Sequence, residues 1–167
     1  MASFTMTSFL CVTVLSGITL VSGYSRARFC QGTCPSGWIS NNGRCFKYVS
    51  YKTNWASAEK RCENMGGNLP SVHSAAEDQF LKNLFKSFSS KDTSFWLGLS
   101  DCQKEGWWFW SDGSKLDYTN WRYRQPDNHQ GKEHCVHMHT SAGKSWNDIP
   151  CSSSFPFICE RADPGLA

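Results

Sequence analysis

The cysteines constrain the fold of this chain more than any other feature of its sequence. The 167 residues include nine cysteines, of which Cys11 lies in an apolar stretch near the start. The eight that follow are Cys30, Cys34, Cys45, Cys62, Cys102, Cys135, Cys151 and Cys159. An even, high count in a secreted chain predicts a disulfide framework, and a zinc site is disfavoured because no Cys-x-x-Cys pair occurs. The spacing alone leaves the pairing open.

The start of the chain predicts secretion. Residues 1–23 carry no charged side chain, and the apolar run Phe9–Val21 is followed by the small residues Ser22 and Gly23. This pattern is typical of a signal peptide that is cleaved after Gly23. A membrane anchor, the alternative, needs about 20 apolar residues, and this run is shorter. We expect a secreted, extracellular protein without a membrane span, made of a short N-terminal segment (24–33), one domain (34–162) and a tail (163–167).

Charge and motifs exclude several classes of function. The net charge is +3 at pH 7, and the basic residues are scattered along the chain. Proteins that bind nucleic acid or anionic membranes carry a denser basic patch. The hydrolase signature Gly-x-Ser-x-Gly and the metalloprotease signature His-Glu-x-x-His are both absent from the sequence. We expect neither an enzyme nor a nucleic-acid-binding protein.

Two helices are predicted in the first half of the domain. The first covers residues 54–65, because Asn54 is a suitable N-cap and a pair of glycines follows Met65. Ser74 and Glu77 fit a capping box at the start of the second helix. Apolar residues then recur at helical spacing and predict one core-facing side, formed by Phe80, Leu81, Leu84 and Phe85.

Short strands and one long loop are predicted in the rest of the domain. Asn42-Gly43 is a hairpin turn signal that leads into a strand over residues 44–51. Later strands are predicted over residues 95–99, 107–110 and 136–139, and the segment 157–160 ends the fold. Residues 113–131 are polar with little periodicity, and long structureless loops in compact domains tend to be functional. Two helices followed by short strands predict an α+β domain.

Five oxygen-bearing side chains in the last third of the chain fit a calcium site. They are Gln125, Asp127, Glu133, Asn147 and Asp148. Calcium prefers about six to eight oxygen ligands, so these five leave room for backbone or external oxygens. Cys135 and Cys151 bracket the second half of the set and could hold it as a closed loop. We predict a calcium ion whose coordination is completed by the hydroxyls of a sugar; the alternative is a solvated polar loop with ordinary turn acids.

Several motifs follow one another between Cys34 and Glu160. They are Cys34-Pro35-x-x-Trp38, Trp96-Leu97-Gly98-Leu99, Trp108-x-Trp110-Ser111-Asp112-Gly113, Gln125-Pro126-Asp127, Trp146-Asn147-Asp148 and the late cysteines Cys135, Cys151 and Cys159. Together they resemble the C-type lectin-like domain family. The resemblance implies a double-loop fold of two helices, small antiparallel sheets and a long calcium-binding loop after Gly113. It also implies a cis peptide before Pro126 and the disulfides Cys34–Cys45, Cys62–Cys159 and Cys135–Cys151.

The resemblance further implies that calcium and a sugar share one site, where two vicinal hydroxyls coordinate the ion. The positions that would contact carbohydrate are Gln125, Asp127, His129, Glu133 and Asn147. Members with Gln-Pro-Asp resemble galactose binders and members with Glu-Pro-Asn resemble mannose binders, because the exchange reverses which position offers an amide donor. Galactose-type sites usually carry Trp or Tyr where this chain has His129, and imidazole stacks less well. We expect galactose-type rather than mannose-type glycans, in the recognition of microbes or host glycoproteins.

Ice binding, or another non-sugar function, is the alternative on the same fold. Calcium-dependent antifreeze proteins of this family resemble the chain at Ser100-Asp101-Cys102 and at Gln125-Pro126-Asp127. Their additional cysteine beside Cys135 is His134 here, however, and the threonines expected in their calcium loop do not occur in residues 128–132. These departures favour the sugar-binding hypothesis.

The histidines and two remaining acids raise the question of a second metal ion. Asp101 and Glu105 match positions of an auxiliary calcium site found in part of the family, but His134 falls where a carboxylate is expected. We therefore do not predict a second calcium ion. The spacing of His134, His137 and His139 raises a zinc alternative, but without a further ligand in fixed geometry we favour surface histidines.

Two cysteines are left over once the implied bridges are drawn, namely Cys30 and Cys102. They pair either within the chain or between two chains, in which case they form a covalent homodimer. A free exposed thiol is the least expected outcome in a secreted protein.

Overall fold

The computed structural model describes residues 34–89, 93–141 and 145–165. The predicted signal peptide and Cys30 lie outside the described residues. The elements are β1 (Ile39–Asn41), β2 (Arg44–Thr53), α1 (Trp55–Glu63), α2 (Ala75–Phe88), β3 (Ser94–Ser100), β4 (Phe109–Trp110), the 3-10 turn η1 (His129–Gly131), β5 (Cys135–His139), β6 (Trp146–Ile149) and β7 (Phe155–Ala162). Two helices and short strands confirm the predicted α+β class.

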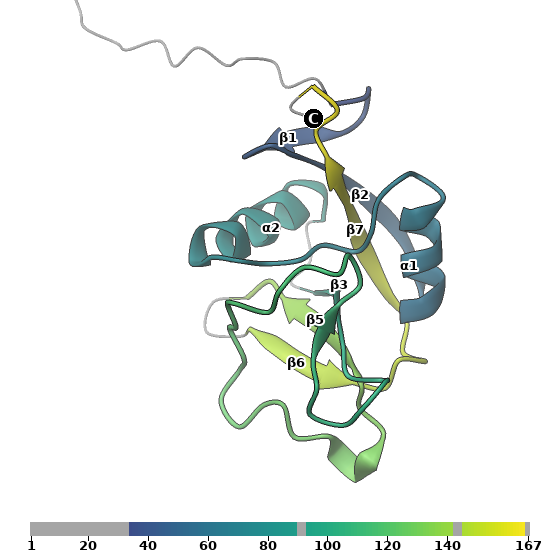
Figure 1. Cartoon of the computed structure of the whole chain (residues 1–167), viewed down its shortest axis with the longest axis vertical. Helices are drawn as coiled ribbons and strands as arrows, with labels where there is room; N and C mark the ends of the chain where they lie inside the picture. Colours follow the sequence, from purple (N-terminus) through teal and green to yellow (C-terminus); the bar gives the residue numbers. More distant parts are fainter. Residues whose placement is uncertain (1–33, 90–92, 142–144, 166–167) are drawn as a thin grey trace, which may run out of the picture. The chain divides into compact units, whose positions relative to one another are not determined.

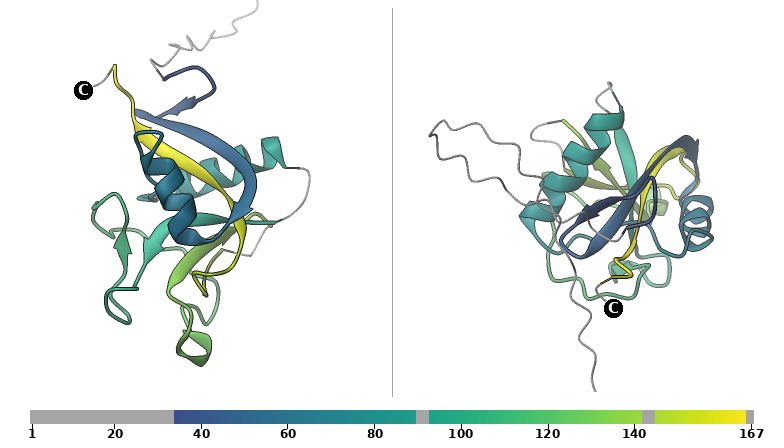
Figure 2. Two further views of the ribbon diagram at one scale, coloured as in Figure 1. Left: turned by 90° about the vertical axis from the view of Figure 1, so that its right-hand side faces the viewer. Right: turned by 90° about the horizontal axis from the view of Figure 1, so that it is seen from above.

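The strands join into one sheet in the order β1-β2-β7-β3-β5-β6, with β4 paired to β3. Neighbouring strands pair antiparallel except β3 with β7, which meet in parallel at Trp96 and Phe157. Figure 1 shows β2 and β7 as a long central pair with α1 and α2 on opposite sides, and the views in Figure 2 agree. Because β2 lies near the start of the domain and β7 near its end, this pair joins early and late segments of the chain.

The helices begin where the sequence predicts. The side chain of Asn54 accepts a hydrogen bond from the Ser57 amide at 2.9 Å, and the Ser74 hydroxyl accepts one from the Glu77 amide at 3.2 Å. These bonds satisfy amides that have no partner inside the first turn of a helix. The Glu77 carboxylate bonds the amide of His73 rather than that of Ser74, so only one half of the predicted capping box is formed.

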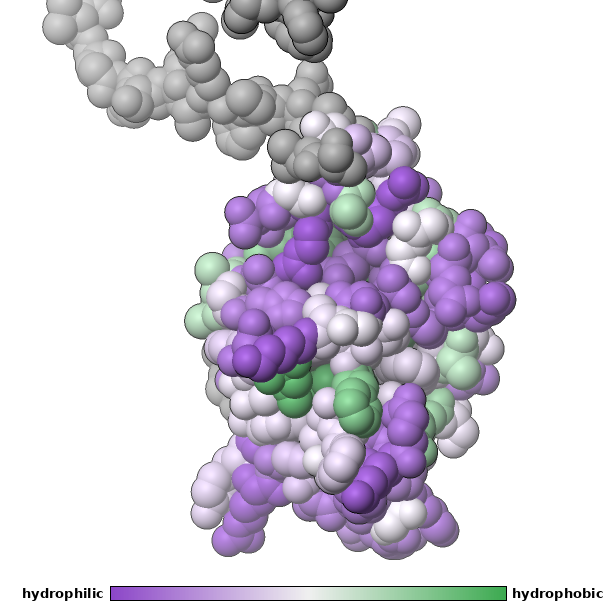
Figure 3. Space-filling view, in the orientation of Figure 1, coloured by the Kyte–Doolittle hydropathy of each residue, from purple (hydrophilic) through white to green (hydrophobic). Residues whose placement is uncertain are grey.

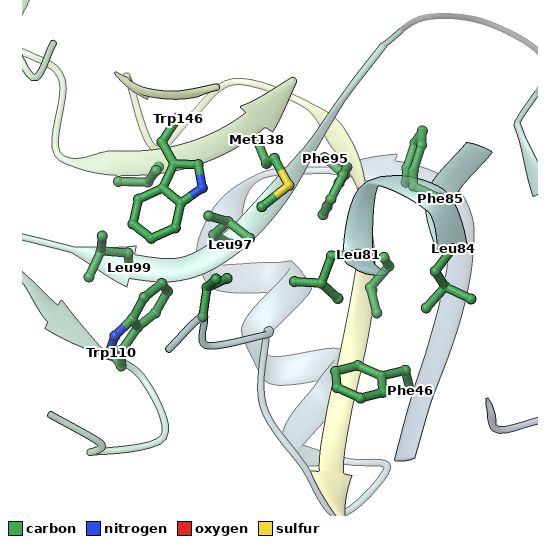
Figure 4. Packing of buried hydrophobic residues seen from close by; sticks show 13 residues of the cluster. Phe46, Leu81, Leu84, Phe85, Phe95, Leu97, Leu99, Trp110, Met138 and Trp146 are labelled. Atoms are coloured by element: carbon green, nitrogen blue, oxygen red, sulfur yellow. The ribbon is translucent and has the colours of Figure 1, made fainter. Parts of the chain in front are cut away.

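The main core packs α2 against side chains from strands β2 to β7 (Figure 4). Three of the four helix residues predicted to face it are buried, and Phe80 packs at its edge. Trp146 of β6 is fully buried, and its ring contacts those of Trp110, Tyr118 and Trp121. Its indole N–H donates to Asp78 Oδ1 on α2 at 2.8 Å. This bond ties the strand that carries two predicted ligands to the helix.

The part of the chain that the structure describes contains three disulfides, which are Cys34–Cys45, Cys62–Cys159 and Cys135–Cys151. They are the three pairs that the family resemblance implies. Among the described residues, Cys102 is free and exposed. Its Sγ lies 3.5 Å from Cys151 Sγ, beside the bridge that closes the predicted calcium loop.

Two strand predictions need correction. The strand predicted over residues 107–110 is reduced to Phe109–Trp110. Residues 146–149 form β6, for which no strand was predicted, because β5 pairs with them along its edge from Cys135↔Ile149 to Met138↔Trp146. Tertiary pairing therefore overrides the weak strand propensity of an Asn-Asp sequence.

Candidate functional site

The predicted site lies in a long loop between β4 and β5 and on the adjacent strand β6. In Figure 1 this loop hangs below β6, at the end of the domain away from β1, and the same end of the face in Figure 3 is mostly hydrophilic. Trp146 fixes one end of the loop, because its backbone N–H donates to Asn120 at 3.0 Å and its carbonyl accepts from Arg122 at 2.9 Å. The Cys135–Cys151 bridge fixes the other end.

Three of the five predicted metal ligands converge at this point. One carboxylate oxygen each of Asp127, Glu133 and Asp148 lies within 4.8 Å of the others. Asp148 is fully buried, and its two oxygens accept hydrogen bonds from the amides of Asp127 at 3.2 Å and Asn128 at 2.7 Å. Glu133 accepts one from the His129 amide at 3.1 Å. The loop backbone therefore holds these carboxylates together.

The proximity of three carboxylates is unfavourable without a cation. Burial raises the pKa of Glu133, and the negative charges of Asp148 and Asp127 raise it further. Like charges at such distances disfavour one another's ionised form, whereas a cation between them favours it. The cluster is therefore chemically suited to a hard divalent cation.

Gln125 provides a further oxygen atom that could coordinate a cation. It precedes Pro126 through a cis peptide bond. Its side-chain Oε1 is buried, and among the described residues it accepts no hydrogen bond. A buried carbonyl oxygen without a partner is unfavourable, and coordination to a cation would satisfy it. These observations fit the calcium ligand set proposed from the sequence.

The two other predicted site residues occupy different surroundings. Asn147 lies on β6 next to Asp148 and donates its side-chain N–H to the Asp148 carbonyl. His129 begins the 3-10 turn η1 and is exposed. Its amide donates to Glu133, and its charge acts to lower the pKa of that carboxyl, so His129 lies beside the carboxylate cluster.

Asn128 is a site residue that the sequence reasoning missed. It has the left-handed backbone conformation (φ 41°), which asparagine adopts more readily than most residues. Its side-chain oxygen accepts from the Glu133 amide at 3.0 Å, and its side-chain N–H donates to Glu105. Together with its backbone bond to Asp148, these contacts make Asn128 the link between the two halves of the cluster. The signal in the sequence was an asparagine directly after Pro-Asp.

The three clustered histidines do not form a common metal site among the described residues. His137 is half-buried, and its ring stacks on Phe155 with centroids 5.0 Å apart. Burial, together with the positive charges of His139 and Arg122, lowers the pKa of His137 to about 4. His134 lies directly before β5, and its ring faces Asp101 and Glu105.

Comparisons with known proteins agree with this architecture. A family model described as "Lectin C-type domain" matches residues 51–161. Lactose-binding lectin l-2 of Anguilla japonica is 44% identical over 163 residues, which cover 95% of this chain and 96% of that protein. No helix among the described residues is long and apolar enough to cross a membrane.

Two solved structures show the same fold. C-type lectin CEL-I from Cucumaria echinata has a TM-score of 0.74 and 31% identity, covering 76% of this chain and 96% of that one. A Ca2+-dependent type II antifreeze protein in its Ca2+-free form has a TM-score of 0.70 and 36% identity, covering 77% of this chain and all of that one. A protein named as a lectin and one named as an antifreeze protein therefore share this fold.

Proposed function

Because the chain belongs to the C-type lectin domain family, we propose that it is a secreted, calcium-dependent lectin that binds galactose-type glycans. The observation that carries the proposal is the convergence of the Asp127, Glu133 and Asp148 carboxylates beside the unpartnered Gln125 oxygen. A relative that is similar over nearly the full length of both chains is named as a lactose-binding lectin, and lactose contains galactose.

The proposed metal ligands are Gln125, Asp127, Glu133, Asn147 and Asp148. Calcium bound there would neutralise the carboxylates and accept two vicinal hydroxyl oxygens of a sugar. Backbone amides in the loop orient Asp148 and Glu133, and Trp146 anchors the strand that carries Asn147. The loop would therefore present its ligands already directed at one point.

Sugar preference follows from hydrogen-bond direction. Gln125 offers an amide N–H donor, whereas Asp127 offers only acceptors when it is ionised. The remaining contacts are assigned to His129, Glu133 and Asn147. His129 provides a smaller and more polar surface than the indole or phenol ring usual at its position, so we expect broad rather than strict galactose selectivity.

The proposal is tested on immobilised galactose. We expect the chain to bind the resin in calcium and to elute in excess chelator, because the carboxylates would then repel one another. Retention in chelator would contradict calcium dependence.

Sugar preference is tested by the double variant Gln125→Glu with Asp127→Asn. It keeps the charge of the ligand set but exchanges donor and acceptor positions, so retention should shift toward a mannose resin. Calcium-induced thermal stabilisation, measured on both proteins, shows that the metal site is intact. Unchanged galactose preference in the stabilised double variant would contradict the assignment.

Ice binding remains the second candidate because an antifreeze protein shares the fold at 36% identity. That function requires thermal hysteresis in solution, which the lectin hypothesis does not predict. Measuring the freezing point and melting point of a calcium-loaded solution separates the two. A hysteresis gap together with no retention on sugar resins would favour ice binding.

We also propose that useful avidity comes from more than one copy of the chain. A single sugar site buries little surface, and linking two sites raises apparent affinity without new contacts. Cys102 is exposed and free among the described residues, so it is available for a covalent homodimer, as is Cys30 if it is accessible. Comparing the mass of the protein with and without reductant tests this proposal.

A further inference from the structure

A second cluster of ligating side chains lies beside the calcium loop and is built from Asp101, Glu105 and His134. One ligand atom of each lies within 4.8 Å of the others. His134 Nδ1 is 3.0 Å from Asp101 Oδ1 and 3.5 Å from Glu105 Oε2. We propose that this cluster is a zinc site, with ligands separate from those of the calcium site.

The two measured separations match the ligand spacing of a tetrahedral zinc ion. Zinc binds imidazole nitrogen and carboxylate oxygen at about 2.0–2.2 Å, so two ligands at the tetrahedral angle lie roughly 3.3–3.5 Å apart. The observed 3.0 and 3.5 Å bracket this value. A shift of a few tenths of an ångström in the ring of His134 would bring both oxygens to equal distances. Little rearrangement is therefore needed for coordination.

The ligand types favour zinc over calcium. Calcium prefers roughly six to eight oxygens at longer distances, whereas imidazole nitrogen suits zinc and neighbouring transition metals. Among the described residues, no further Asp, Glu, His or Cys joins the cluster. Three protein ligands leave one position of a tetrahedral zinc ion for water. Three ligands are too few to form a calcium shell.

The surrounding structure holds the three ligands in place. The Asp101 carboxylate is fully buried, and its second oxygen accepts a hydrogen bond from the Gly106 amide at 2.7 Å. The Asp101 backbone N–H donates to the His134 carbonyl at 3.1 Å, next to the β3–β5 pair Ser100↔Cys135. The two segments that carry these ligands are therefore joined through the sheet.

Asn128 holds the Glu105 side chain in place, and the cluster remains accessible to solvent. The Glu105 side chain is 58% exposed, yet Asn128 donates a hydrogen bond to the same oxygen that faces His134. Because the His134 side chain is 33% exposed, an ion can reach the cluster from solvent. A buried carboxylate, a fixed imidazole and a tethered exposed carboxylate together make a preorganised site with an entry path.

Titration calorimetry of the purified chain with zinc chloride tests the proposal. Saturating calcium is present throughout, so that zinc does not report on the carboxylates of the calcium loop. We expect one zinc ion per chain. His134→Gln removes the nitrogen ligand but keeps a polar side chain beside Asp101, and it should weaken zinc binding at least tenfold, since even indirect partners of a metal ligand contribute about 10–100-fold.

Two further variants keep the test decisive. Glu105→Gln changes an exposed position and should also weaken zinc binding about tenfold or more, even if the His134 variant fails to fold. His73→Gln removes a histidine that lies ahead of α2 and pairs with Asp117, outside both clusters, and should leave zinc affinity unchanged. Zinc affinity that is retained in both the His134 and Glu105 variants, or lost in the His73 variant, would overturn the proposal.

Discussion

Removing one carboxylate from the calcium cluster should have opposite effects on stability with and without calcium. Glu133→Gln keeps the shape of the side chain and an oxygen that can accept the His129 amide. It removes one of three negative charges that lie within 4.8 Å of one another. At that distance each pair of charges repels by about 0.9 kcal/mol in water and by about 3.5 kcal/mol at an effective dielectric constant of ~20.

Glu133 takes part in two such pairs, with Asp127 and Asp148. Because Asp127 is exposed, solvent screens its charge well. We therefore take about 1–3 kcal/mol for the total repulsion between Glu133 and the two aspartates. The variant should therefore be more stable than the parent protein by about 1–3 kcal/mol in chelator, which corresponds to roughly 3–10 °C in Tm for a domain of this size. Added calcium should raise the Tm of the parent protein but not that of the variant.

Thermal unfolding followed by circular dichroism at low ionic strength measures both effects. Glu63→Gln serves as the control, because Glu63 is an exposed carboxylate on α1 whose partner is Lys60. This change should shift stability by no more than about 0.5 kcal/mol and leave the effect of calcium intact. If Glu133→Gln lowers stability in chelator, or keeps the full calcium effect, the reasoning about charge repulsion is wrong.

Three other changes test the fold. Gly67→Ala should destabilise the domain by about 3 kcal/mol or more in urea unfolding, because the added Cβ would lie 1.9 Å from the Glu160 carbonyl oxygen; near-parental stability would contradict this placement. Replacing Cys62 and Cys159 by serine opens a loop with a sequence separation of 97 and should cost about 4–5 kcal/mol on the chain-entropy account. His137→Phe should flatten the acid arm of the stability profile, measured in chelator. The pKa of about 4 in the folded state, against an ordinary 6.5, means that His137 stabilises above pH 6.5 and that about 3 kcal/mol is lost as pH falls toward 4; an unchanged acid slope would contradict this.

The helices and the first strands of this fold follow from local sequence signals. Contacts within a few residues set the backbone conformation at the helix starts Asn54 and Ser74 and at the Asn42-Gly43 turn. β6 could not be found in this way, because its residues acquire strand geometry by pairing with β5. The same holds for the burial of His137, which depends on Phe155 in another strand.

The candidate site was predictable in its residue types but not in its geometry. The five proposed ligands were chosen by chemistry and by family motifs, and the structure brings the three carboxylates among them together. The role of Asn128 does not follow from spacing, because it depends on a left-handed backbone conformation in the loop. The family resemblance places Asp101, Glu105 and His134 at one site, and the pairing of β3 with β5 sets the distances within it.

The double attachment of the long loop has a consequence for how this domain can change over time. Asn120 and Arg122 are bonded to Trp146 at one end, and Cys135 is bridged to Cys151 at the other. Substitutions between these two attachments therefore need not move the aromatic cluster around Trp146. Residues 123–134 can therefore vary without displacing that cluster, as long as their bonds to Asp101, Glu105 and Asp148 are kept.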